Sequence, residues 1–157
     1  MTRALYFEDF KPGDRFDSAT LTLTEALIVE YARFYDPQPF HTDPEAARTT
    51  VFGGLIASGM QTIGIGFKLF FETGVLSACS LGSPGLDEIR WKAPVRPGDT
   101  LRVVAEVLET RPSSSRPDRG LVRILFSTLN QRGDTVSTFI GNQLCRRRPR
   151  GQGIITP

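Results

Sequence analysis

Hydrophobic and polar positions in the first half of the chain follow helical spacing in two long stretches. The segment TEALIVEYARFYD begins at Thr24, a suitable N-cap, and places apolar residues on one helical face at positions 27, 28, 31, 32 and 35. Pro37 ends this helix, because the residue before a proline is disfavoured in the helical conformation. The second stretch, MQTIGIGFKLFFETG, is almost wholly apolar up to Gly74, which predicts a helix buried in the core.

Gly64 and Gly66 lie inside the apolar stretch, where each costs about 1 kcal/mol relative to alanine. We expect them to mark a close approach of this helix to another backbone, such as a sheet. Between the two long helices, DPEAART predicts a short helix with Asp43 as N-cap and Pro44 in the first turn. A glycine-rich connection, TTVFGGLIASG, then leads into the buried helix.

The remaining pattern is that of strands. RFDSATLTLT follows a Pro-Gly-Asp turn and predicts a strand with imperfect alternation, and LDEIRWKAPV, the turn RPGD and TLRVVAEVLETR follow the buried helix. After a polar loop at 112–120, LVRILFSTLNQRGDTVSTFIGNQLCRR predicts a hairpin that turns at Arg-Gly-Asp. This order predicts the α+β class, with one antiparallel sheet wrapped around one buried helix in a single domain over residues 1–157.

Composition narrows the class of protein. The chain has 157 residues, 39% of them hydrophobic and 23% charged, and no apolar run long enough to span a bilayer. The first residues, MTRALYFEDF, lack the apolar stretch of a secretory signal. Cys79 and Cys145 are expected to be reduced and packed as small hydrophobic residues, and with one histidine they make a poor metal site. We therefore expect a cytoplasmic, metal-free protein.

Charge is concentrated at the C-terminal end, although the net charge is only +2. The run RRRPR, Arg146 to Arg150, is consistent with a solvated end that follows the last strand. It is also consistent with contact to a phosphate of a nucleotide-bearing substrate, to a membrane or to nucleic acid. No aromatic interleaving or nucleic-acid motif accompanies it, so we expect neither a nucleic-acid nor a membrane partner.

Candidate chemistry lies in YDPQPFHTD, residues 35–43, which holds the only histidine of the chain, His41. Asp36 precedes it by five residues, and Pro37 and Pro39 restrict the backbone between the two side chains. A carboxylate and an imidazole that converge on one water molecule can remove one proton and return another near neutral pH. The alternative is structural: His41 bonds a loop carbonyl and Asp36 caps a helix.

The following segment, FGGLIASGM at 52–60, passes through two glycines and small residues into the start of the buried helix. Free backbone amides at a helix start, aided by the helix dipole, can stabilise a developing oxyanion. The alternative is a tight turn that needs flexible backbone. Together with the acid–base pair, an amide-lined pocket would suit an acyl substrate whose carbonyl becomes an enolate.

The string YARFYDPQPFHTDPEAARTTVFGGLIASGM resembles the signature of the MaoC-like, (R)-specific enoyl-CoA hydratase family, which has the hot-dog fold. RWKAPVRPGDTL is similar to the strand-turn-strand that follows the central helix in that family. The resemblance covers roughly residues 8–147, which leaves 148–157 as a C-terminal tail. It implies syn addition of water to a trans-2-enoyl thioester to give the (R)-3-hydroxyacyl thioester, or the reverse dehydration.

The resemblance also implies roles for particular residues and partners. Asp36 and His41 would activate water and supply the α-carbon proton, and the Gly59 amide would polarise the thioester carbonyl. Substrate contacts are expected from the end of the glycine-rich connection and the helix start: Phe52, Gly53, Ser58, Met60 and Ile63. The substrate would be a CoA or acyl-carrier-protein thioester, no cofactor is implied beyond the CoA of that substrate, and family members form homodimers or dimers of dimers.

Two positions depart from the family pattern. Gln38 stands where the hydratases usually carry an asparagine that helps to position the water, and Ser58 replaces a frequent histidine before the helix-starting glycine. The acyl chain would contact the helix face, for which Met60, Ile63, Phe67 and Phe70 are candidates, although helical spacing of such residues more often indicates core. Trp91 is expected to pack on a strand rather than to contact a ligand.

Two other functions fit the same fold. A hot-dog thioesterase would hydrolyse the thioester with a carboxylate base and would leave His41 without a task. A non-catalytic acyl-thioester-binding or accessory subunit is the other alternative, with Gln38 and Ser58 as marks of a site that has drifted.

Overall fold

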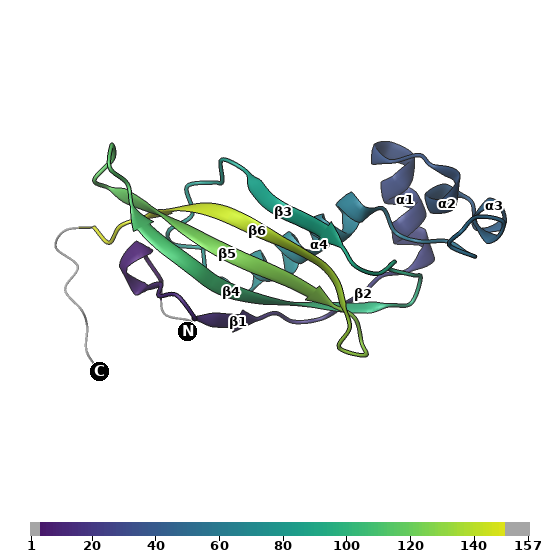
Figure 1. The fold of residues 1–157 in the computed structure, drawn as a ribbon, viewed down its shortest axis with the longest axis horizontal. Coiled ribbons are helices and arrows are strands. Elements are labelled where there is room, and N and C mark those ends of the chain that lie inside the picture. Colours follow the sequence, from purple (N-terminus) through teal and green to yellow (C-terminus); the bar gives the residue numbers. More distant parts are fainter. Residues whose placement is uncertain (1–3, 150–157) are drawn as a thin grey trace.

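A six-stranded antiparallel sheet packs against one long helix in the computed structural model, which describes residues 4–149 (Figure 1). The strands run in the order β1-β4-β5-β6-β3, and β2 also pairs with β4. Their bounds are β1 Arg15–Asp17, β2 Leu21–Thr22, β3 Leu86–Trp91, β4 Thr100–Pro112, β5 Arg119–Leu129 and β6 Thr135–Arg146. β4, β5 and β6 form a meander that is the wide middle of the sheet.

The helices lie in two groups. The long central helix is α4 (Gly59–Glu72), which lies behind the sheet in Figure 1. At one end of the molecule three helices follow one another closely: α1 (Glu25–Tyr35), α2 (Pro39–Thr42) and α3 (Pro44–Arg48). A single 3-10 turn, η1 (Phe7–Asp9), lies near the opposite end. No helix within the described part of the chain is long and apolar enough to cross a membrane.

The core lies between α4 and the inner face of the sheet. Alternate residues of β4, Val103, Ala105 and Val107, are at most 1% exposed, and they face the buried side of α4, where Phe70 is 1% exposed. Burial of a large apolar side chain contributes about 1.5–3 kcal/mol, so this layer is the main source of stability. Cys79 and Cys145 are free thiols and are both buried, as the sequence predicted.

The two glycines of the central helix differ in their surroundings. A side chain on Gly66 would lie 2.9 Å from Oγ1 of Thr128 on β5, so this glycine does allow the close approach that the sequence predicted. The same expectation is wrong for Gly64, which is exposed and has no neighbouring atom within 4 Å of the position of a Cβ. Gly66 therefore contacts the sheet, and Gly64 faces away from it.

Three local predictions needed correction. The expected N-terminal strand is divided into β1 and β2, and directly after β1 the Ser18 hydroxyl accepts a hydrogen bond from the backbone amide of Val103. The segment around His41, for which no helix was predicted, contains the short helix α2, with Pro39 in its first turn. On α1, Tyr35 is 75% exposed although its spacing predicted burial.

Candidate active site

Asp36 and His41 are brought together by the end of α1 and the start of α2. The N-cap Thr24 begins α1 as predicted, and the helix ends at Tyr35 because Pro37 follows. Asp36 is therefore the C-cap residue, and its backbone amide donates to Ala32. Its Oδ2 atom lies 3.3 Å from Nε2 of His41, which α2 carries back toward it.

The orientation of His41 is fixed by a backbone acceptor. Nδ1 lies 2.7 Å from the carbonyl oxygen of Ile56, and since a carbonyl only accepts, Nδ1 carries the proton and donates it. The ring is 4% exposed. The other ring nitrogen, Nε2, is thereby directed at Asp36. His41 therefore makes the bond to a loop carbonyl that a purely structural role would require, and it also faces a carboxylate.

Two donors hold the Asp36 carboxylate. The Ser58 hydroxyl donates to Oδ2 at 2.7 Å, and the Gln38 side-chain amide donates to Oδ1 at 2.7 Å. Burial alone would raise the pKa of Asp36, but these hydrogen bonds and the nearby His41 together lower that pKa below its ordinary value. The side chain is therefore a carboxylate at neutral pH.

A cavity of about 430 Å³ opens beside the Asp36–His41 pair. Its walls are largely apolar, and the aromatic rings of Phe40 and Phe52 lie 5.1 Å apart on one side. The lining residues come from α1–α2, the connection to α4, the start of α4 and the segment after β3: Asp36, Gln38, Phe40, His41, Phe52, Ile56, Ala57, Gly59, Met60, Thr62, Trp91, Lys92, Ala93, Pro94 and Val95. An apolar cavity with a few convergent polar groups is typical of a small-molecule site.

The start of α4 forms one edge of the cavity. Ser58 is its N-cap and accepts a hydrogen bond from the Met60 backbone amide at 3.2 Å. Gly59, the first residue of the helix, lines the cavity and packs so closely against Trp91 that a Cβ would lie 2.5 Å from the indole Nε1. The positive end of the helix dipole is therefore directed toward the space beside Asp36 and His41.

Of the nine residues to which the sequence assigned a catalytic or substrate-binding role, six line the cavity and three do not. Gly53 lies in an exposed turn with a φ of 66°, Ser58 is fully buried beneath Asp36, and Ile63 belongs to the core at 4% exposure. Those inside the lining are Asp36, Gln38, His41, Phe52, Gly59 and Met60. Of the helix residues considered for the acyl chain, Phe67 and Phe70 also pack in or against the core, which leaves Met60 at the cavity.

Sequence reasoning missed the wall formed by Trp91 and the residues up to Val95. Trp91 lies on a strand as expected, since it is the last residue of β3, and its ring packs against Gly59; its exposure of 53% and its place in the cavity lining were not expected. The available signal was Pro94, which limits a strand pattern to the residues before it.

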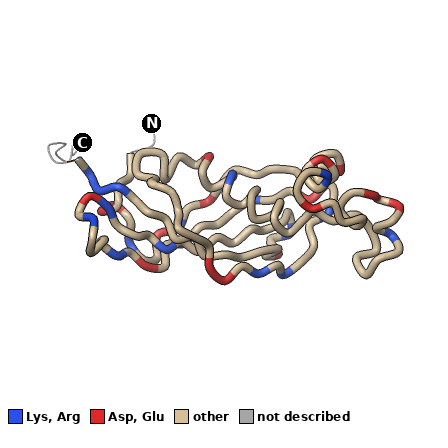
Figure 2. The backbone as a smooth tube through the Cα atoms, turned by 90° about the horizontal axis from the view of Figure 1, so that it is seen from above, with Lys and Arg blue, Asp and Glu red and all other residues tan. Residues whose placement is uncertain are grey.

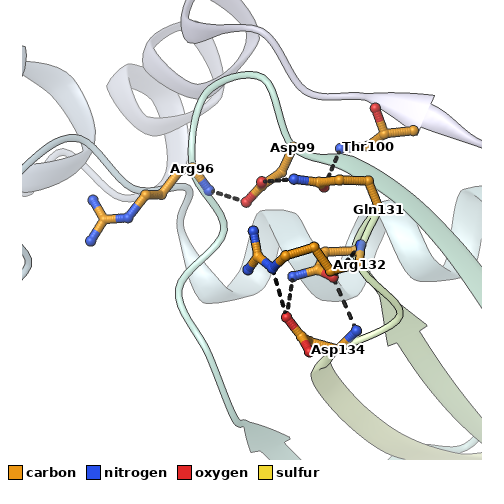
Figure 3. Close-up of polar contacts among 7 residues, drawn as sticks. Arg96, Asp99, Thr100, Gln131, Arg132 and Asp134 are labelled. Atoms are coloured by element: carbon orange, nitrogen blue, oxygen red, sulfur yellow. Dashed lines mark hydrogen bonds and ion pairs between the residues drawn. The ribbon is translucent and has the colours of Figure 1, made fainter.

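The loop behind this wall is held by hydrogen bonds to the β5–β6 hairpin (Figure 3). Asp99 accepts from the backbone amide of Arg96 at 2.8 Å and from the side chain of Gln131 at 2.9 Å, and Gln131 accepts from Thr100. The guanidinium group of Arg96 points away from this cluster and donates to the backbone oxygen of Phe52. The segment after β3 is thereby joined to the connection that precedes α4.

The basic C-terminal run lies away from the cavity, at the end of the molecule opposite α1–α3 (Figures 1 and 2). Arg148 forms an ion pair with Asp9 at 2.6 Å, and Arg147 lies 3.8 Å from Glu8. Arg150 is outside the described residues. Arg147 and Arg148 therefore contact η1 of their own chain, whereas Arg146 is the last residue of β6. In residues 4–149, no group of three or more histidine, cysteine, aspartate or glutamate side chains is placed to hold a metal ion.

Comparison with known proteins identifies the family. Residues 9–123 match the family model of the MaoC like domain, and the chain belongs to that family. A MaoC-like dehydratase from Rhodospirillum rubrum has a solved structure that is 43% identical, with a TM-score of 0.86 over 93% of this chain and 99% of that one. The fold is the hot-dog fold, which a Mycobacterium tuberculosis protein of 20% identity contains as a double hotdog, with a TM-score of 0.77 over 94% of this chain and 46% of that one.

Two relatives were found by sequence, one named for an enzymatic activity and one named as uncharacterized. The (R)-specific enoyl-CoA hydratase of Rhodospirillum rubrum is 36% identical over 107 residues, which are 65% of this chain and 69% of the hydratase. YdeM, an uncharacterized protein of Bacillus subtilis, is 34% identical over 125 residues, 80% of this chain and 87% of that protein. The chain therefore belongs to a family whose named members include hydratases and dehydratases.

Proposed function

We propose that this protein adds water to a trans-2-enoyl thioester in the syn sense and gives the (R)-3-hydroxyacyl thioester, or catalyses the reverse dehydration. The observation that carries the proposal is the Asp36–His41 pair, 3.3 Å apart at the wall of an apolar cavity that also contains the start of α4. The similarity to an (R)-specific enoyl-CoA hydratase supports the same reaction.

In the proposed reaction the pair moves two protons. One member removes a proton from water as the water oxygen bonds to C3 of the enoyl group, and the C2–C3 double bond becomes an enolate. The other member gives a proton to C2, so that one water molecule is added in total. Both side chains line the same cavity, and a carboxylate and an imidazole are side chains that can serve as general base and general acid.

The developing enolate needs a donor for its oxygen, and we assign this role to the backbone amide of Gly59. It is the first residue of α4 and lines the cavity, where the helix dipole favours negative charge. Gln38, which donates to Asp36, would orient the carboxylate. Phe52 and Met60 would contact the acyl chain, which suits their apolar side chains.

The thioester carrier in this proposal is CoA or an acyl-carrier protein, and the active form is a homodimer or a dimer of dimers. β3 is the last strand in the sheet order, so one of its edges lacks a strand partner among residues 4–149. An unpaired edge can pair with another strand, and a second copy would extend the sheet across β3.

Rates of crotonyl-CoA hydration test the assignment of the pair. Asp36→Asn and His41→Ala should each lower kcat by about 10² to 10⁴-fold, because each removes one partner of general acid–base catalysis. Asp118→Asn is the matched control, since this exposed carboxylate pairs with Arg119 at the start of β5 and does not line the cavity. Hydration that continues at the wild-type rate in Asp36→Asn and His41→Ala would contradict the proposal.

A further inference from the structure

Ser58 connects the candidate pair to the central helix. Its side chain is fully buried, and its hydroxyl oxygen accepts a hydrogen bond from the Met60 backbone amide at 3.2 Å. The single hydroxyl proton is directed to Oδ2 of Asp36, 2.7 Å away. A serine hydroxyl has one proton to donate, so this geometry uses it entirely on the carboxylate.

The same oxygen of Asp36 also faces His41. Nδ1 of the ring donates to the carbonyl of Ile56, so Nε2 carries a proton only when the ring is cationic. A neutral ring and an ionised carboxylate would present lone pairs to each other across the 3.3 Å between Nε2 and Oδ2. The pair is therefore complementary when it shares one proton, held either on Nε2 or on Oδ2.

The hydrogen-bond donors around Asp36 determine whether the shared proton lies on Nε2 of His41 or on Oδ2 of Asp36. Ser58 donates to Oδ2 and Gln38 donates to Oδ1, so both carboxylate oxygens are already hydrogen-bonded as acceptors. Hydrogen bonds to a charged acceptor are stronger than those to a neutral one, which favours the ionised carboxyl group. The shared proton consequently belongs on His41.

We propose that Ser58 is a positioning residue that holds Asp36 ionised and turned toward His41, and so makes Asp36 the base and His41 the acid of the hydration. This inference rests on the proposed function. Ser58 acts through Asp36, because it lies outside the lining of the cavity. The family resemblance had suggested a substrate contact for this residue, and the contact seen is with the carboxylate.

The resulting proton path is balanced. Oδ2 or Oδ1 of Asp36 takes a proton from water as the hydroxyl group bonds to C3, and Nε2 of His41 gives its proton to C2. Asp36 is then protonated and His41 neutral. A proton that passes across the contact between Oδ2 and Nε2 restores the starting state, and the reverse path serves dehydration.

Three titratable side chains face Asp36 or line the same cavity. His41 faces it from α2, Tyr31 from its own helix α1, and Lys92 lines the same cavity from the segment after β3. Burial, with the neighbouring Tyr35 and Asp36, raises the pKa of Tyr31 above 10.0, so Tyr31 stays neutral at the pH of the assay. The acid side of the pH profile therefore reports on the pair.

The pH dependence of kcat/KM for crotonyl-CoA in three variants tests this role. Ser58→Ala removes the donor to Oδ2, so the acid limb should move to higher pH, and kcat at neutral pH should fall about 10- to 100-fold with little change in KM. Ser58→Thr keeps a hydroxyl group and should restore the wild-type pH profile. Thr24→Ala is the matched control, since Thr24 is also a helix N-cap with a 3.2 Å bond but does not contact Asp36.

A second measurement separates this inference from the proposed function. The ¹³C signal of the Asp36 carboxyl, assigned by its loss in Asp36→Asn, should titrate at higher pH in Ser58→Ala than in the wild type. An unchanged titration, or a pH profile of Ser58→Ala that overlays the wild type, would overturn the role of Ser58. A wild-type protein that hydrates no enoyl thioester would overturn the proposed function, while the carboxyl titration still decides on Ser58.

Discussion

Gly59 shows how one missing side chain shapes the cavity. The Trp91 indole occupies the space where a Cβ would lie, with Nε1 at 2.5 Å and Cε2 at 2.6 Å from that position. Real atoms do not approach so closely, so the ring lies against the start of α4 only because residue 59 has no side chain. The contact joins the proposed oxyanion donor to the wall after β3.

Gly59→Ala should displace the Trp91 ring and lower the free energy of unfolding by about 1–3 kcal/mol, with a higher KM for crotonyl-CoA. Trp91→Ala, combined with Gly59→Ala, removes the ring that the new methyl group meets. Urea unfolding of the two single variants and the double variant measures the coupling between them. Strictly additive losses would contradict a direct clash between residue 59 and the indole.

Contacts in the site could be predicted from the sequence only where the two residues lie close together along the chain. Asp36 and His41 are five residues apart with two prolines between them, so their proximity follows from local geometry. Ser58 reaches Asp36 across 22 residues, and Trp91 contacts Gly59 although it comes later in the chain, after the whole of α4. Contacts of this kind depend on how the helix docks on the sheet, which no local pattern contains.

The central helix illustrates the same difference for a whole element. Its existence and its end near Gly74 follow from apolar content and a helix stop, and the structure confirms them. The orientation of the helix about its axis does not follow from the pattern, because the stretch is apolar on nearly every side. This is why Gly64 and Gly66 were assigned the same role although only Gly66 contacts the sheet.

Alanine substitutions at these two glycines should have opposite effects on stability. Gly64→Ala should raise the free energy of unfolding by about 0.5–1 kcal/mol, since alanine is the better helix former and the site has room. Gly66→Ala should lower it by about 1–3 kcal/mol, because its methyl group would meet Thr128. Thermal or urea unfolding of the two variants in parallel measures both values, and changes of the same sign would contradict the packing described for α4.

The starts of α1 and α3 could be predicted from their N-caps, whereas the division of the N-terminal strand could not. The N-caps Thr24 and Asp43 both accept backbone amides as predicted, because capping is a local interaction. The division of the N-terminal strand was not predictable from local pattern, since the side-chain contact at this point joins Ser18 to Val103, 85 residues away.

At the scale of the whole molecule, helices α1 and α2, which contribute to the cavity lining, and the C-terminal end of β6 lie at opposite ends (Figure 1). The α+β class was predictable because strands and helices follow each other in a characteristic order. The position of the arginines was not predictable, since their partners Glu8 and Asp9 come from the other end of the chain. The proposed site therefore does not include a contact between Arg147 or Arg148 and a phosphate of a substrate bound in the cavity of the same protomer.

The central claim is that this fold and its Asp36–His41 pair hydrate an enoyl thioester with one stereochemical outcome. Its most direct measurement follows the conjugated absorbance of trans-2-enoyl-CoAs of graded chain length, with chiral analysis of the product. Loss of the band with formation of the (R)-3-hydroxyacyl-CoA is the predicted result. An (S) product, or no loss at any chain length while calorimetry detects binding, would contradict the account.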